Sequence, residues 1–155
     1  MERPLLTLQE ATPEDWPDWR DVRLAALTDA PHAFRTTVDD WNRGAEQRWR
    51  ERLAMPDALN LLARDDGVVV GLASGIRYPD GVAEVRSVWV SPRARGKGVA
   101  DLLLTAIEEW AVRQGAPELR LDVLPGNERA IALYRRHGFV PTGGEEMRKP
   151  LVAKR

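Results

Sequence analysis

Residues 88–104 read VWVSPRARGKGVADLLL, and this stretch decides the fold. A strand-like apolar run ends at Val90, a Ser-Pro turn follows, and an apolar helical stripe begins at Val99. Two glycines, Gly96 and Gly98, stand directly before that stripe. Glycine lets a backbone approach a ligand closely, and the first N–H groups of a helix are unpaired and carry partial positive charge. The junction therefore predicts an anion-binding loop that opens a helix.

Two familiar phosphate-binding loops do not match this junction. A P-loop needs Gly-Lys-Ser/Thr, and here Lys97 is followed by Gly98 and Val99. A dinucleotide fingerprint starting at Gly96 needs Gly or Ala where Asp101 stands, and it follows a first strand rather than a mid-chain one. An ordinary polar turn between a strand and a helix is the alternative interpretation of the loop.

The segments on both sides of the junction predict a mixed sheet. Asp-Asp-Gly at residues 65–67 and Pro-Asp-Gly at residues 79–81 are tight-turn sequences, so the apolar segments around them should form an antiparallel meander. The expected strands are residues 5–9, 59–64, 68–77, 82–90, 119–124, 139–142 and 147–152, and the expected helices are residues 13–28, 38–54, 99–114 and 128–137. This order predicts an α/β (α+β mixed sheet) fold with helices on both faces. Without a repeat or linker, residues 1–155 should form a single domain.

The composition excludes several classes of protein. The 155 residues contain no cysteine, which rules out Cys-ligated zinc, iron–sulfur clusters and cysteine nucleophiles. Lys plus Arg (23) nearly balance Asp plus Glu (24), which argues against broad phosphate neutralisation on a nucleic acid. The sequence also lacks a membrane-spanning apolar run and a secretory leader, so we expect no membrane association and a cytoplasmic location.

A second group of residues follows the strand at 119–124. Asn127 comes directly before the helix at residues 128–137, where it suits an N-cap, a structural role that would explain it alone. Tyr134 lies two helical turns further on, so both side chains can face the end of the preceding strand. As an alternative, Tyr134 is an amphipathic core aromatic with its hydroxyl at the edge.

Residues 88–104 together with residues 121–143, LDVLPGNERAIALYRRHGFVPTG, resemble the GCN5-related N-acetyltransferases, the GNAT family. The acyl-CoA motif of that family, Q/R-x-x-G-x-G/A, falls on Arg95, Gly98 and Ala100. The resemblance covers residues 59–152 well and the N-terminal helices mainly by the order of elements.

A second register of the motif, on Arg93, Gly96 and Gly98, also fits the letters. The first is preferred because it starts the helix after Gly98 and keeps the valine-x-proline lead-in of the family, here Val90 and Pro92.

The resemblance implies a GNAT-like acyl-CoA N-acyltransferase fold with a mostly antiparallel central sheet. It also implies an N-acetyltransferase that moves an acetyl group from acetyl-CoA to a primary amine of a small molecule or protein. The amine would attack directly in a ternary complex, with acetyl-CoA as cosubstrate and no metal. The cofactor contacts of the family fall on Val88, Trp89, Val90, Arg95, Gly96, Lys97, Gly98, Val99, Ala100 and Asn127.

The resemblance also points to two proton-transfer groups. Tyr134 would protonate the departing CoA thiolate, a plausible task for a phenol because a thiol is a fairly good leaving group. Glu84 lies eleven residues before Arg95, at a strand position from which several family members supply a carboxylate. It is the candidate general base for the acceptor amine, and a solvent-facing strand glutamate is the alternative.

The acceptor is the least defined part of the prediction. Residues 1–40 contain nine acidic and four basic side chains, and Asp29, Asp39 and Asp40 would suit a cationic amine. The expected partners are acetyl-CoA and an amine acceptor, without nucleic acid or membrane, and a homodimer is left open. A non-catalytic acyl-CoA-binding module is the rival function, because the same loop would hold the cofactor without any acceptor being modified.

Overall fold

The computed structural model describes residues 6–29 and 45–151. The helices are α1 (Trp16–Asp29), α3 (Ala45–Leu53), α4 (Val99–Arg113) and α5 (Glu128–Arg136). The strands are β1 (Leu6–Glu10), β2 (Ala58–Asp65), β3 (Val68–Arg77), β4 (Ala83–Val90), β5 (Glu118–Asp122), β6 (Val140–Gly143) and β7 (Glu146–Pro150). The expected order of elements is confirmed, with boundaries shifted by a few residues. Of the helix expected over residues 38–54, residues 45–53 are helical and residues 38–44 lie outside the described part of the chain.

The strands form one mixed sheet in the order β1-β2-β3-β4-β5-β7-β6. Neighbouring strands are antiparallel except for β4 and β5, which are parallel. The expected meander of β2, β3 and β4 is confirmed. Its first turn uses Asp66 and Gly67, both with positive φ, as the Asp-Gly pair predicts.

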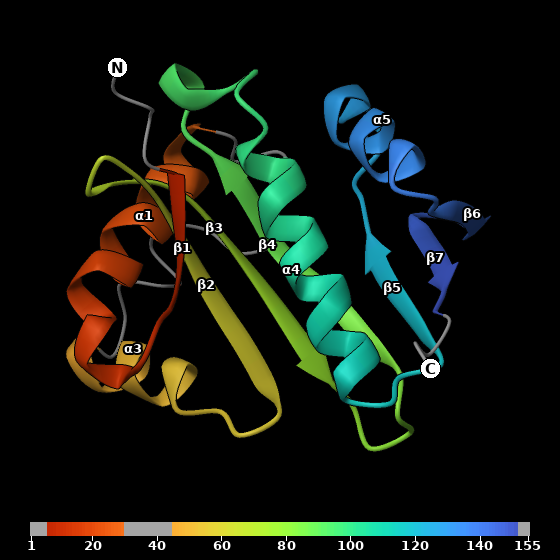
Figure 1. Ribbon diagram of the computed structural model, residues 1–155, viewed down its shortest axis with the longest axis horizontal. Helices are drawn as coiled ribbons and strands as arrows, with labels where there is room; N and C mark the ends of the chain where they lie inside the picture. The colour runs from red at the N-terminus through yellow and green to blue at the C-terminus, as the bar shows by residue number, and fades with distance from the viewer. Residues whose placement is uncertain (1–5, 30–44, 152–155) are drawn as a thin grey trace.

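Helices cover both faces of the sheet, with α4 on one side and α1 and α3 on the other (Figure 1). Gly75 on β3 lets α4 approach closely, because a Cβ there would lie 2.7 Å from the ring of Trp110. A larger side chain would force the helix away, and such overpacking typically costs 1–3 kcal/mol. The position of α4, and of the loop that precedes it, therefore depends on a residue without a side chain.

Helix α1 packs on the opposite face through a buried stripe. Trp19, Val22 and Ala26 belong to a core cluster with Leu62, Leu72 and Trp89 of the sheet. The same helix buries Arg23, which is 7% exposed. A guanidinium within an apolar stripe is costly to bury, so this position differs from the rest of the helix face.

Candidate active site

Strands β4 and β5 pair only where they begin. Ala83 lies opposite Leu119 and Glu84 opposite Arg120, and beyond these two pairs the strands diverge toward the end where α4 starts (Figure 1). Among the described strands, none occupies the β5 side of β4 from residue 85 to residue 90. The edge of β4 that faces this gap therefore carries backbone N–H and C=O groups available to a ligand.

A β-bulge interrupts β4 three residues past the last β4–β5 pair. Leu72 on β3 faces Trp89 and Ser74 faces Arg86, so two residues of β4, Ser87 and Val88, stand opposite a single residue of β3. Ser87 has φ of 62°, a left-handed conformation that a serine rarely adopts. Bulges redirect backbone groups and are common beside active sites, and strain of this kind costs of order 1–3 kcal/mol. The bulge therefore makes this part of β4 a candidate functional segment.

The loop between β4 and α4 has the conformation that the two glycines require. Gly96 and Gly98 have φ of 82° and 81°, and Gly98 is the N-cap of α4, which begins at Val99. This helix start agrees with the preferred register of the acyl-CoA motif. A Cβ at either glycine would meet no protein atom within 4 Å. The backbone is thus exposed beside the N–H groups of the first helical turn, which fits a pyrophosphate group.

Asp29 ties the end of α1 to β4 and to this loop. Its Oδ2 accepts hydrogen bonds from Trp89 Nε1 at 2.9 Å and from Arg95 Nη2 at 2.7 Å. Arg95 Nε also donates to the carbonyl oxygen of Val90 at 3.1 Å. The hydrogen bond from Trp89, followed by that from Arg95, holds the pKa of Asp29 below its ordinary value.

These contacts involve two residues that the sequence assigns to ligand binding, Arg95 and Asp29. The Arg95 side chain is directed at protein partners, so we expect it to shape the loop. Lys97 is more exposed, and its Nζ lies 3.7 Å from Asp65 Oδ2. Asp29, which the sequence suggested for attracting a cationic amine, already accepts two donors. Asp39 and Asp40 lie outside the described residues.

Helix α5 lies at the open end of the gap (Figure 1), with Asn127 as its N-cap and Tyr134 as its buried residue. Asn127 is confirmed as the N-cap, with its Oδ1 accepting from the N–H of Ala130 at 3.4 Å. Tyr134 is buried in the core, and its ring meets that of Phe139 edge-on at 5.9 Å. Burial raises the pKa of Tyr134 to about 12, so the phenol stays protonated at neutral pH.

Asp101 in the first turn of α4 fixes α5 relative to the loop. Its Oδ1 accepts from Arg136 Nη2 at 2.8 Å and lies 2.7 Å from Nε2 of His137. These two contacts, with His137 contributing more, lower the pKa of Asp101. No local pattern in the sequence indicates this link, because Arg136 and His137 lie 35 and 36 positions after Asp101.

Glu84 lies at the closed end of the gap and is the last residue of β4 that pairs with β5. Its side chain is 15% exposed and accepts from the hydroxyl of Tyr78 at 3.1 Å and from Arg86 Nε at 2.8 Å. Arg120 Nε lies 3.4 Å from the other carboxylate oxygen. Donors thus surround the carboxylate, and its role as general base stays a prediction.

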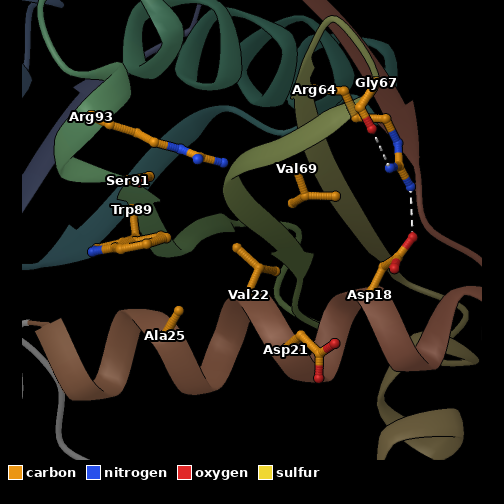
Figure 2. A pocket seen from close by; sticks show the side chains of 10 residues that line it. All are labelled: Asp18, Asp21, Val22, Ala25, Arg64, Gly67, Val69, Trp89, Ser91 and Arg93. Atoms are coloured by element: carbon orange, nitrogen blue, oxygen red, sulfur yellow. Dashed lines mark hydrogen bonds and ion pairs between the residues drawn. The ribbon is translucent and has the colours of Figure 1, made fainter.

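Two adjoining hollows lie on the α1 side, beyond the end of β4. The first, of about 460 Å³, is bordered by α1, the β2–β3 turn and residues 91 and 93 (Figure 2). Figure 2 shows the side chain of Arg93 extending across it, while Arg64 bonds to Asp18 at 2.8 Å. The second, of about 620 Å³, shares Trp89 and Ser91 with the first. Both therefore lie on the α1 face of the sheet, beside the first residues after β4.

Neither a metal centre nor a membrane span is found over residues 6–29 and 45–151. No group of three or more His, Cys, Asp or Glu side chains there could hold a metal ion. In the same part of the chain, every helix is too short or too polar to cross a bilayer.

Comparison with known proteins agrees with this geometry. The sequence matches the model of the acetyltransferase (GNAT) family over residues 10–139. It is 33% identical over 142 residues to a mycothiol acetyltransferase of Clavibacter michiganensis subsp. michiganensis, covering 89% of this chain but only 44% of that relative. The chain thus spans less than half the length of this curated relative.

Two solved structures show the same fold. A GNAT-family acetyltransferase from Streptococcus pneumoniae superposes with a TM-score of 0.81 at 21% identity, covering 96% of this chain and 100% of that one. The PaiA N-acetyltransferase from Thermoplasma acidophilum, in complex with coenzyme A, gives 0.78 at 20% identity and covers 94% and 99%. With the family match over most of its length, the chain belongs to the acetyltransferase (GNAT) family.

Proposed function

We propose that this protein transfers an acetyl group from acetyl-CoA to a primary amine in a ternary complex. The observation that carries the proposal is the bulged, unpaired edge of β4 at Ser87, which leads directly to the loop that contains Gly96 and Gly98 before α4. A linear ligand with an anionic end and a reactive end fits this arrangement. Its anionic end would meet the helix start, and its reactive end would meet the bulge.

In this proposal, the N–H groups of residues 95–100 hold the pyrophosphate, with Lys97 as an exposed cation. The pantetheine arm adds to the edge of β4 as an extra strand would, through the backbone of Val88, Trp89 and Val90. A β4 N–H group near the bulge polarises the thioester carbonyl, an oxyanion-type contact. Asn127 caps α5 and bonds the cofactor or a water beside it.

The acceptor nitrogen attacks the thioester carbon, the C–S bond breaks, and an amide and CoA thiolate result. The amine loses one proton and the thiolate gains one, so the products are the acetylated amine and CoA thiol. We assign the proton donor for the thiolate to Tyr134, which is protonated at neutral pH because burial raises its pKa to about 12. Glu84, acting directly or through water, is the candidate that removes the proton of the amine.

Two measurements test the proposal. Calorimetry should detect binding of acetyl-CoA, and a thiol-reactive dye should detect CoA release when amines are added. The chain contains no cysteine, so the protein gives no background in the thiol assay. Binding of acetyl-CoA without thiol release from any amine in a broad panel would identify an acyl-CoA-binding module instead.

A further inference from the structure

Asp29 stands at an unfavourable place for a carboxylate. It is the last residue of α1, and the backbone C=O groups at the C-terminus of a helix carry partial negative charge. An acidic side chain there destabilises the helix, and the last turn of α1 contains no basic residue that would compensate. The groups that stabilise this carboxylate therefore come from outside α1.

The partners of Asp29 belong to two other segments. Trp89, whose ring lies on the α1 side of β4 (Figure 2), donates from Nε1 to Asp29 Oδ2 at 2.9 Å. Arg95 Nη2 donates to the same oxygen at 2.7 Å. The side chains of Asp29 and Arg95 are 30% and 34% exposed, so water screens this ion pair less than it screens a surface pair. One carboxylate oxygen thus joins α1, β4 and the loop before α4.

Arg95 extends this connection to the backbone. Its Nε donates to the C=O of Val90, the last residue of β4, at 3.1 Å. Arg95 is also the C-cap of the short 3-10 turn at Pro92–Ala94 and directly precedes Gly96. The guanidinium is planar and holds its N–H groups in fixed relative directions. The side chain therefore links the two ends of the segment 90–95 and is itself held by Asp29.

Both ends of this segment belong to the proposed cofactor site. The pantetheine arm is assigned to the backbone of residues 88–90, and the pyrophosphate to the N–H groups of residues 95–100. Residues 91–94 connect the two, so the conformation of this short turn sets the distance between them. A cofactor that binds both segments gains affinity when the correct spacing exists before it arrives, because no ordering is then required on binding.

We propose that Asp29 is a positioning residue for acetyl-CoA, which holds the end of β4 and the loop containing Gly96 and Gly98 at the spacing that the cofactor needs. This inference rests on the proposed function and adds a residue of α1 to the cofactor site. Asp29 acts through the side chains of Trp89 and Arg95, and the backbone groups that meet the cofactor stay free. It replaces the expectation that Asp29 attracts a cationic amine.

The first test removes both acceptor oxygens. Asp29→Ala should raise the dissociation constant for acetyl-CoA at least tenfold in calorimetry, whereas Asp29→Asn keeps one acceptor and should retain part of the affinity. The kcat at saturating acetyl-CoA should stay within about twofold, because the reaction centre at the bulge is untouched. A merely structural Asp29 would lower the melting temperature without this selective loss of cofactor affinity.

Asp21→Ala is the matched control for this test. Asp21 lies on the same helix and pairs with Arg20 at 2.9 Å, with 67% of its side chain exposed. Its removal should leave the affinity for acetyl-CoA unchanged. An unchanged affinity in a folded Asp29→Ala protein, or an equal loss in Asp21→Ala, would overturn the inference.

The second test asks whether Asp29 acts through Arg95. Arg95→Met removes the guanidinium donors, keeps a long side chain, and should also raise the dissociation constant at least tenfold. If the two residues form one linkage, the double variant should bind acetyl-CoA about as weakly as the weaker single variant. Losses that multiply to about a hundredfold in the double variant, or full affinity in Arg95→Met, would overturn the positioning role.

A third test examines the loop without a ligand. Trypsin can cleave after Arg93, Arg95 and Lys97 in the loop, and after the exposed Arg113 at the end of α4. The rate of loop cleavage relative to cleavage after Arg113, measured by mass spectrometry, should rise several-fold in Asp29→Ala and stay constant in Asp21→Ala. Equal ratios in all three proteins would overturn the inference.

The three tests also separate this inference from the proposed function. Binding of acetyl-CoA that Asp29→Ala weakens, in a protein that releases no thiol with any amine, would support the positioning role and overturn acetyl transfer alone. Thiol release with an acetyl-CoA affinity that Asp29→Ala leaves unchanged would overturn the positioning role alone.

Discussion

Replacing Gly98 by alanine should separate cofactor binding from folding. Gly98 has φ of 81°, and a left-handed conformation costs an L-residue roughly 1–2 kcal/mol. A Cβ at this position meets no protein atom within 4 Å, so no steric term adds to that strain. We expect a loss of about 1 kcal/mol of stability, equivalent to about 2–4 °C in melting temperature for a chain of this size.

The same Cβ should damage acetyl-CoA binding far more than folding. It projects from the N-cap of α4, where the pyrophosphate is expected to approach the backbone. We predict at least a tenfold rise in the dissociation constant for acetyl-CoA, which corresponds to ~1.4 kcal/mol. Calorimetry with acetyl-CoA and thermal unfolding without it measure the two effects separately.

Gly115→Ala provides the control at the other end of the same helix. Gly115 has φ of 76° and equally open surroundings, so alanine introduces similar strain. Its melting temperature should fall by a similar amount and its affinity for acetyl-CoA should not change. Unaltered affinity in a folded Gly98→Ala protein, or equal losses of affinity in both variants, would refute the assignment of the loop.

Three further predictions concern proton transfer and the coupling of α5 to α4. Tyr134→Phe keeps the packing and should lower kcat by about 10²-fold with little change in acetyl-CoA affinity; because the pKa of Tyr134 is about 12, the loss should be equal at pH 7 and pH 9. An unchanged kcat in Tyr134→Phe would show that Tyr134 is a core aromatic and not the proton donor. Glu84→Gln should flatten the acidic limb of the pH profile of kcat/KM, and an unaltered limb would assign the proton to water or another group. Asp101→Asn should lower the melting temperature at neutral pH. The pKa of Asp101 is lower in the folded protein than in the unfolded chain, where it is about 4. The ionised carboxylate therefore stabilises the fold fully above about pH 4, and this stabilisation is lost as the pH falls through the folded pKa. The melting temperatures of the unaltered protein and of Asp101→Asn should thus converge in acid, and a difference that does not change with pH would contradict this.

Local patterns in the sequence predicted most elements of the fold. The Asp-Gly turns determine the β2–β3–β4 meander, since they connect segments only a few residues apart. Gly98 and the apolar stripe from Val99 identify the start of α4, and Asn127 identifies the start of α5. In each case the physical cause lies within one or two turns of chain, where a linear pattern contains it.

Parts of the candidate site had weaker signals in the sequence. Arg23 interrupts an apolar helical stripe. This pattern indicates that the position is unusual, but it does not indicate which residues surround the Arg23 side chain in the fold. The sequence suggested Asp29 as a carboxylate for a cationic amine, whereas its partners Trp89 and Arg95 lie 60 and 66 positions away. Ser87 adopts a left-handed conformation, which a serine in the sequence does not predict as a glycine would.

The sequence by itself thus determined the family, the order of elements and the loop that should meet the cofactor. The tertiary structure was needed to show that β4 bulges at Ser87, that it leaves β5 after two pairs, and that Arg86 shares a row of the sheet with Asn60 and Ser74. The physical reason is strand register. A single extra residue in β4 sets which of its side chains face α1 and which face α4, and no local pattern encodes where that residue is inserted.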